Sequence, residues 1–260
     1  MAKPWEATLG TADVGALEDL GLEPCGIVLG TCVVQQGFNQ SSYGMSSQFG
    51  FQNINQYSGP DPIHLAWQTS ISRLLGDAAA RGAHGVVGVE VNFIPTGEGR
   101  AIELMIKGTA VRRAGHNPPA IPFSTIADAR QIVKLLSAGL APRQVVLGYF
   151  VERVSDYITS MQMQSWQNTE ITFLSRAATQ VRNSAIDDMV ASARSSGCEQ
   201  IIGTKLSSHT YEYEVNQQTY FTLYATAVGT GVYRVPKRMF DQRPITMMRL
   251  RDKADPDSLI

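Results

Sequence analysis

Cysteine is scarce in this sequence, and so are long apolar runs and any excess of charge of one sign. Its 260 residues include three cysteines, too few and too unevenly shared between the two halves for a disulfide framework. The formal net charge of −1 gives no long-range field to hold nucleic acid or an anionic membrane. The longest apolar run, Gly26–Val34, is about half of a membrane-spanning helix, and the N-terminus lacks the apolar run of a signal peptide. We expect a cytoplasmic protein that binds no nucleic acid and does not insert into membranes.

The sequence also lacks the spacings that are typical of catalytic sites. The glycine-rich segment Pro95–Gly99 is not followed by the Gly-Lys-Ser/Thr of a phosphate-binding loop. Neither a nucleophile elbow nor a dinucleotide-binding fingerprint is present. Glu212 and Glu214 share one face of an expected strand, roughly 7 Å apart, which is more typical of a solvated hairpin than of a catalytic carboxylate pair. The sequence therefore predicts a protein that is not an enzyme and nominates no catalytic residue.

Three blocks of sequence occur twice, in the same order. Ile27–Gly30 recurs as Val145–Gly148, Gly85–Gly88 as Gln200–Gly203, and Gly108–Val111 as Ala225–Val228. The second copies lie 118, 115 and 117 residues after the first ones. A repeat of roughly a hundred residues is the size of a domain, which indicates a tandem duplication.

Each repeat predicts the same order of elements: a buried strand, a long helix and a β-hairpin. The strands are expected at Gly26–Val34 and Val145–Val151, and the helices after Pro62 and after Ile171. A short helix precedes each unit, the second one expected at Thr125–Ser137 with Ser124 as its N-cap. The predicted fold is α+β, with two tandem β-α-β-β domains, each a small antiparallel three-stranded sheet packed on one long helix. Expected boundaries are 1–116, 117–234 and a tail 235–260, with an insertion at 35–59. Such small units leave a helix face and two sheet edges uncovered, which favours oligomers.

The repeated blocks resemble the YbjQ family of small bacterial domains. The resemblance lies in the Val-Leu-Gly-Thr that ends the first strand, in Ala83–Val91 and in Met105–Val111, with Ala225–Val228 as the second closing strand. It implies dodecin-like β-α-β-β units that assemble as pentameric rings, a heavy-metal-binding label and no established enzymatic activity. Whole two-domain chains cannot fill five positions of one ring. We therefore expect a homopentamer of two stacked rings; a ring with an even number of domains is the alternative.

A metal site is the first chemistry to weigh, because the resemblance raises a divalent or heavy metal as a cofactor. His84 and Cys198 lie at near-equivalent turns of the two repeats and are the candidate ligands. Cys25 and Cys32 are seven residues apart on one expected strand, hence on opposite faces unless a bulge intervenes. Zinc normally takes three or four such ligands, so buried thiols and a polar turn histidine are the favoured interpretation. We expect His64 and His116 to be solvated, like the helix-face pair Asp187-Asp188.

Two further segments are candidates for binding a protein partner. Residues 35–59 are rich in Gln, Asn, Ser and Gly, with almost no charge, as is typical of a flexible loop. The alternative is that its aromatic residues become ordered in an assembly; these are Phe38, Tyr43, Phe49, Phe51 and Tyr57. The tail 235–260 interleaves basic and apolar residues, which favours docking on a neighbouring subunit over partner binding or disorder.

The sequence as a whole predicts a ring-forming oligomeric scaffold or binding module. The alternative is a protein that sequesters a heavy metal or small ligand at subunit interfaces. An enzyme with a site shared between subunits is a distant third.

Overall fold

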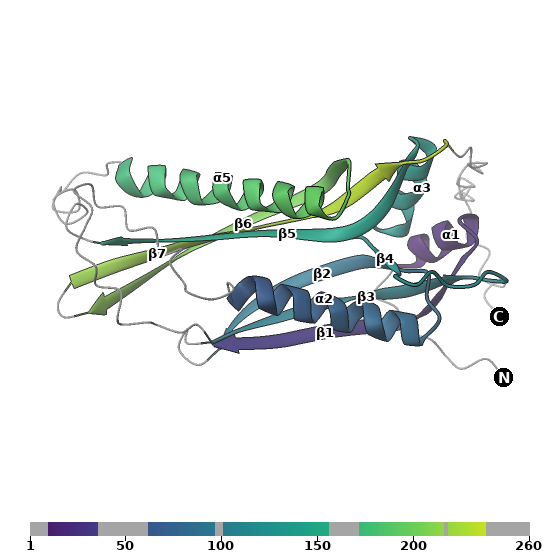
Figure 1. Cartoon of the computed structure of the whole chain (residues 1–260), viewed down its shortest axis with the longest axis horizontal. Coiled ribbons are helices and arrows are strands. Elements are labelled where there is room, and N and C mark those ends of the chain that lie inside the picture. The colour runs from purple at the N-terminus through teal and green to yellow at the C-terminus, as the bar shows by residue number, and fades with distance from the viewer. Residues whose placement is uncertain (1–9, 36–61, 97–100, 156–171, 216–217, 238–260) are drawn as a thin grey trace, which may run out of the picture.

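The computed structural model describes residues 10–35, 62–96, 101–155, 172–215 and 218–237 (Figure 1). The first half contains α1 (Thr11–Asp19), β1 (Leu22–Gln35), α2 (Pro62–Ala80), β2 (Gly85–Thr96) and β3 (Ala101–Arg113). The second contains β4 (Phe123–Ser124), α3 (Ala129–Ser137), β5 (Leu140–Ser155), α5 (Thr172–Ser195), β6 (Gln200–Val215) and β7 (Gln218–Arg234). The first sheet has the order β1-β3-β2-β4 and the second the order β5-β7-β6. The expected α+β class is confirmed, with a strand-helix-strand-strand unit in each half.

The glycine that ends the first repeated block allows the long helix to lie directly on the first strand of each unit. A Cβ on Gly30 would lie 2.8 Å from the backbone nitrogen of Leu74 in α2. A Cβ on Gly148 would lie 2.8 Å from the Cβ of Met189 in α5. Both distances are shorter than any ordinary carbon contact, so only glycine fits at this crossing. This close contact explains why the repeated block of both strands ends in glycine.

The glycine of the second repeated block forms a β-bulge in each sheet. Gly88 and Gly203 have φ of 61° and 64°, in the left-handed region. The pairing with the closing strand shifts between Val87 and Glu90 in the first sheet, and between Ile202 and Lys205 in the second. A bulge with glycine in this conformation bends the strand and strengthens its twist.

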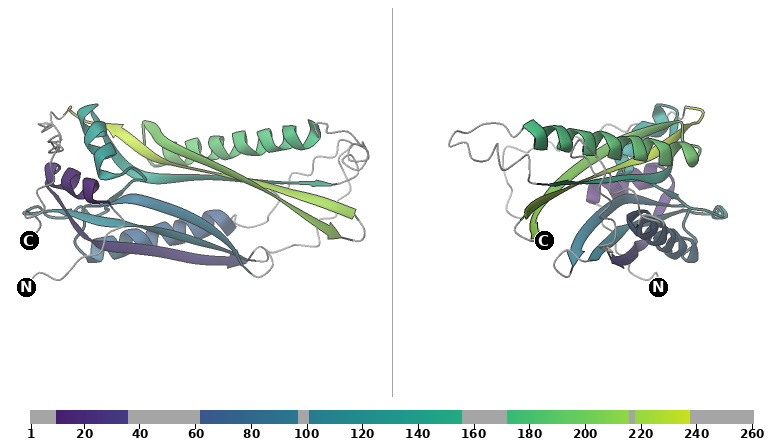
Figure 2. Two further views of the ribbon diagram at one scale, coloured as in Figure 1. Left: turned by 180° about the vertical axis from the view of Figure 1, so that it is seen from behind. Right: turned by 60° about the vertical axis from the view of Figure 1, so that its left-hand side comes forward.

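The two units stack as layers (Figures 1 and 2). α5 covers one face of the second sheet, and the opposite, helix-free face of that sheet packs on the first unit. Val145, Leu147 and Tyr149 of β5 belong to the same core cluster as Trp67 and Leu74 of α2. The first hydrophobic core therefore contains side chains of both repeats.

The link between the units differs from the expected helix at Thr125–Ser137. α3 begins at Ala129, where the Asp128 side chain accepts from the backbone N–H of Gln131 at 2.8 Å. Ser124 is not its N-cap, because its hydroxyl accepts from Val145 N–H at 2.9 Å. Ser124 itself lies in β4, a two-residue strand parallel to β2 that the sequence did not predict. The linker is thus used to cover the edge of the first sheet before the chain enters the second.

The short helices α1 and α3 close one end of the first sheet. Their side chains form a small core with Val87 and Val111, both fully buried. Asp13 of α1 accepts from the guanidinium of Arg130 in α3 at 3.1 Å. None of the helices in the described part of the chain is long and apolar enough to cross a membrane.

Candidate functional site

Both segments proposed to bind a protein partner fall mostly outside the described residues. Of the insertion 35–59, the structure describes Gln35, the last residue of β1, and of the tail 235–260 it describes 235–237. Phe38, Tyr43, Phe49, Phe51 and Tyr57 all lie outside the described residues. Their role in partner binding stays a prediction.

The candidate metal ligands His84 and Cys198 each lie in the turn that follows the long helix of their own unit. His84 Nδ1 accepts from the backbone N–H of Arg113 at 3.1 Å, while its Nε2 is buried without a hydrogen-bond partner. Cys198 packs against the second core, and burial raises the pKa of its thiol, opposed by the charge of Arg143. Among the described residues, no three His, Cys, Asp or Glu side chains gather as a metal site would require. A metal site at these two residues stays a prediction.

Cys25 and Cys32 do not point to opposite sides of β1. Cys25 is the extra residue of a bulge between Pro24 and Gly26, the exception that the sequence left open. Both thiols are half-buried and pack against the first core. Burial raises the pKa of Cys25, with Arg112 acting in the opposite direction. Both thiols therefore pack against the core without being fully buried.

A polar contact joins the two units at a place that the sequence analysis missed. His64 near the start of α2 bonds Asp188 of α5, with Nε2 and Oδ2 2.9 Å apart. The same carboxylate oxygen accepts from Tyr149 N–H of β5 at 2.9 Å. The two side chains are 36% and 32% exposed, so they are partly solvated as expected, but the expectation missed that they pair with each other. Only the stacking of the units brings these residues together, 124 positions apart in the chain.

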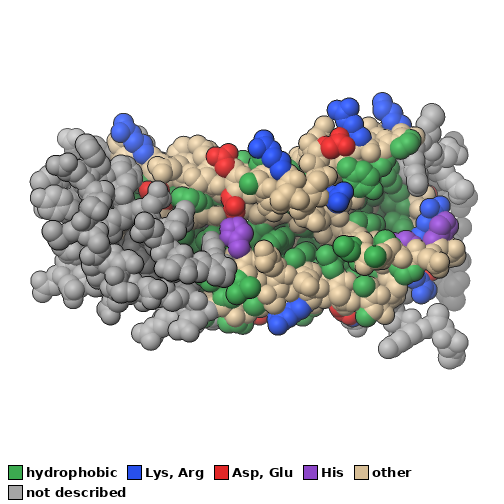
Figure 3. Space-filling view, viewed as in Figure 1, with side chains coloured by type: hydrophobic (Ala, Val, Ile, Leu, Met, Phe, Trp, Pro, Cys, Tyr) green, Lys and Arg blue, Asp and Glu red, His purple; other side chains and the backbone are tan. Residues whose placement is uncertain are grey.

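The two sheets differ in how their helix-free faces are covered. Leu147 of the second sheet is 1% exposed, because the first unit packs on it. Leu29, its counterpart in the repeat, is 49% exposed, and Val33 on the same face is 62% exposed. An ion pair between Lys107 and Glu90, at 3.0 Å, crosses the middle of this face. Figure 3 shows hydrophobic side chains gathered in the hollow between the stacked layers, where the second sheet is covered.

β6 is the most exposed strand of the described chain. Every residue from Gly203 to Glu212 is exposed except Ser208, which is half-buried. On its helix-free side Tyr211 and His209 stack on Tyr224 of β7, with ring centroids 5.5 and 5.2 Å apart. Burial and the hydrogen bond with Tyr211 raise the pKa of Tyr224. β6 thus presents an aromatic surface and an unpaired edge.

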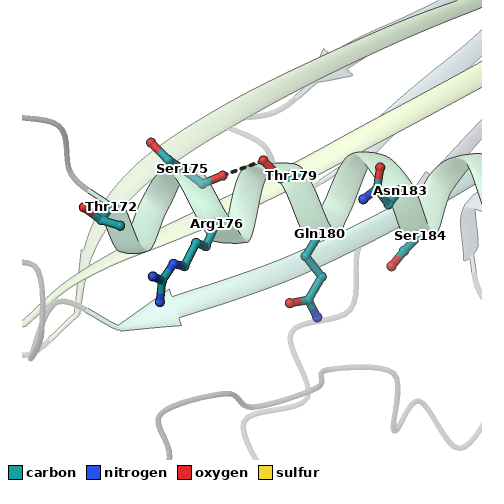
Figure 4. A pocket seen from close by; sticks show the side chains of 7 residues that line it. All are labelled: Thr172, Ser175, Arg176, Thr179, Gln180, Asn183 and Ser184. Atoms are coloured by element: carbon teal, nitrogen blue, oxygen red, sulfur yellow. Dashed lines mark hydrogen bonds between the residues drawn. The ribbon is translucent and has the colours of Figure 1, made fainter.

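A polar depression of about 610 Å³ runs along the outer side of α5. Figure 4 shows that its labelled side chains all come from this helix; they are Thr172, Ser175, Arg176, Thr179, Gln180, Asn183 and Ser184. Arg176 is its one charged group among the described residues, and Thr179 Oγ1 donates to the carbonyl of Ser175 at 2.9 Å. The described residues that line the depression do not bring together the convergent charged groups that mark an enzyme site.

No protein-family model matches the chain. The chain is similar to the encapsulin nanocompartment protein Rv1762c of Mycobacterium tuberculosis, with 27% identity over 240 residues. The alignment covers 89% of this chain and 87% of the relative, so it includes both units. The similarity therefore applies to the whole tandem arrangement and not to one domain.

Proposed function

We propose that this chain is a non-enzymatic subunit that assembles with copies of itself into a scaffold, as part of a protein compartment. The finer form of the proposal is a homopentamer of two stacked rings, one of each YbjQ-like unit. No catalytic role is assigned to any residue.

The unequal cover of the two equivalent sheet faces is the observation that carries the proposal. Along β5 the helix-free face of the second sheet is buried within the chain, whereas Leu29 and Val33 at the equivalent place on β1 are exposed. An exposed apolar face on a repeat whose twin is buried indicates a surface that a second copy covers. Lys107 and Glu90 give this face charges of both signs, so that two copies can meet without net repulsion.

The similarity to a nanocompartment protein over the full tandem supports the same assignment. A compartment is built from many copies of few chains, and such assembly requires exposed surfaces that are complementary between copies. Both lines of support concern assembly and not chemistry.

Native mass spectrometry of the purified chain tests the proposal. One ring pair should have five times the chain mass of 28.3 kDa, about 142 kDa, or a multiple of it. A monomer at micromolar concentration would overturn the proposal. A stable oligomer of another size would overturn only the pentamer.

A pair of matched variants tests the surface. Leu29→Glu places a charge on the exposed face of the first sheet and should weaken the assembly by at least tenfold in dissociation constant. Ile121→Glu changes a more exposed apolar residue, 76% accessible and outside the sheets, and should leave the assembly unchanged. Equal assembly of both variants would contradict the assignment of this face.

A further inference from the structure

β6 has an edge that nothing in the described chain covers. Within the second sheet, β6 pairs with β7 and with no other strand. The other outer edges are occupied at least in part. Arg73 donates to Thr31 on β1, β4 lies along β2, and Asp188 accepts from Tyr149 on β5. An open edge of this length is a template for adding another strand.

The hydrogen bonding of β5, at the opposite edge of the same sheet, shows which backbone groups of β6 are free. Tyr149 N–H points away from β7, toward Asp188, so the backbone groups of Thr226, its partner on β7, point toward β6. Ser207 faces Thr226 and uses its own groups in that pairing. Because backbone groups alternate in direction along a strand, the N–H and C=O groups of Ser208, Thr210 and Glu212 point away from β7, toward the free edge of the sheet.

The charges beside this edge complement each other across a two-fold axis. Arg182 of α5 reaches over β6, and its guanidinium donates to Ser208 Oγ at 3.0 and 3.1 Å. In an antiparallel pairing centred on Thr210, Ser208 of one copy stands opposite Glu212 of the second. Directly opposite residues have Cβ atoms about 5 Å apart, within reach of the guanidinium. Among the described residues neither Arg182 nor Glu212 forms an ion pair within its own chain.

The same pairing sets His209 of one copy opposite Tyr211 of the other. These two side chains already flank the ring of Tyr224 on the helix-free side. Aromatic side chains on directly opposite residues stabilise an antiparallel pair. Hydrogen bonds, charge and aromatic contacts therefore favour one register.

We propose that β6 pairs with β6 of a second copy of this chain, antiparallel about Thr210, with Arg182 of each copy bound to Glu212 of the other. The contact joins two second sheets into one continuous sheet and is self-complementary, as a two-fold interface must be. It rests on the proposed scaffold function and deepens it. The pentamer is built through other surfaces, and the two-fold contact joins one pentamer to the next.

The test compares the mass of the full chain and four variants by native mass spectrometry and light scattering. Thr210→Pro removes an outward N–H that β7 does not use, a position where an edge strand tolerates proline. Thr210→Ala keeps that N–H and is its control. Arg182→Glu places two acidic groups opposite each other, and the double variant Arg182→Glu/Glu212→Arg restores the pair with reversed signs. Circular dichroism verifies that each variant is folded.

The wild type and Thr210→Ala should have a mass at least twice that of one pentamer. Thr210→Pro and Arg182→Glu should fall to the mass of one pentamer, and the double variant should return to the wild-type mass. A wild-type mass unchanged by Thr210→Pro and by Arg182→Glu overturns the β6 contact and leaves the scaffold proposal standing. A wild type that is monomeric overturns the scaffold proposal itself.

Discussion

Gly30 provides a direct test of the packing that places each long helix on its sheet. In Gly30→Ala the added methyl would lie 2.8 Å from Leu74 N, 2.9 Å from the carbonyl carbon of Ser70, and closer still to the oxygen of that carbonyl. Ordinary carbon contacts are about 3.5–4.0 Å, so α2 would have to move outward by the order of 1 Å. Because the opposing atoms are backbone, no side chain can rotate away to relieve the contact.

The expected cost follows from two opposing effects. Overpacking a core typically costs about 1–3 kcal/mol, and the rigid helix backbone puts this site at the upper end. Replacing glycine by alanine also reduces the entropy of the unfolded chain, which returns up to about 1 kcal/mol. The net expectation is a loss of about 2 kcal/mol in the free energy of unfolding. For a chain of this length, that lowers Tm by roughly 4–8 °C.

Gly76→Ala is the matched control for this prediction. Gly76 lies in α2, where an added Cβ would meet nothing within 4 Å apart from its chain neighbours and the adjacent backbone of its own helix. In a helix interior, alanine is about 0.5–1 kcal/mol more favourable than glycine, so this variant should be more stable than the wild type. Urea unfolding and calorimetry at one fixed protein concentration measure both. Equal stability of the two variants would refute the argument that Gly30 is required for the close approach of helix and strand.

Three more predictions concern the junction, the bulge and a buried carboxyl. Asp188→Ala removes the acceptor for His64 and for Tyr149 N–H and should cost about 1–2 kcal/mol by urea unfolding, whereas Asp188→Asn, which keeps an acceptor oxygen, should cost less. Gly203→Ala forces a side chain into φ of 64° and should cost about 1–2 kcal/mol in the same assay; no loss would mean that the bulge relaxes. Glu152 is 5% exposed with one carboxylate oxygen lacking a hydrogen bond, and burial raises its pKa above the ordinary value of 4.5. The folded state therefore favours the protonated acid, and this stability is lost as the pH rises through the raised pKa. Glu152→Gln should melt above the wild type at pH 7.5 and together with it at pH 4, and a gap that does not change with pH would contradict the assignment.

The elements of each unit could be predicted from the sequence because each depends on local signals. Pro62 marked the start of α2. The glycines of the repeated blocks were recognised only as repeated residues, and their roles at the strand-helix crossing and the bulge emerge from the structure. The predicted start of α3, Thr125, lies four residues before the observed start at Ala129. Ser124 could either cap a helix or accept a hydrogen bond from a distant backbone group, and the structure shows the second. The sequence signal for an N-cap does not reveal that Val145 N–H, 21 positions away, competes for the same hydroxyl.

The stacking of the two units could not be predicted, because its contacts carry no local pattern. Nothing in the sequence near His64 or Asp188 indicates that they meet. The aromatic contacts of Tyr211 with Tyr224 follow from strand register, which pattern alone fixes poorly. The continuous apolar sequence of β1 and β5 predicted a buried strand in each unit. It did not reveal that the helix-free face of β5 would be covered within the chain, whereas Leu29 and Val33 on the same face of β1 would be exposed.

The two halves protect the first strand of each sheet with opposite charges. Arg73 lies three residues after Ser70, whose carbonyl meets Gly30 at the crossing of α2 and β1. Asp188 lies three residues after Ala185, whose carbonyl meets Gly148 at the crossing of α5 and β5. Arg73 donates to the carbonyl of Thr31, and Asp188 accepts from the N–H of Tyr149 at the matching place on β5. In the sequence, Arg73 and Asp188 stand at equivalent positions of the two repeats with opposite charges. In space both residues occupy a free strand edge, one by donating to it and the other by accepting from it. Because both first strands carry such a group and β4 covers β2, β6 has, among the described residues, the edge where another strand can add with least obstruction. Assembly through sheet edges should therefore begin there.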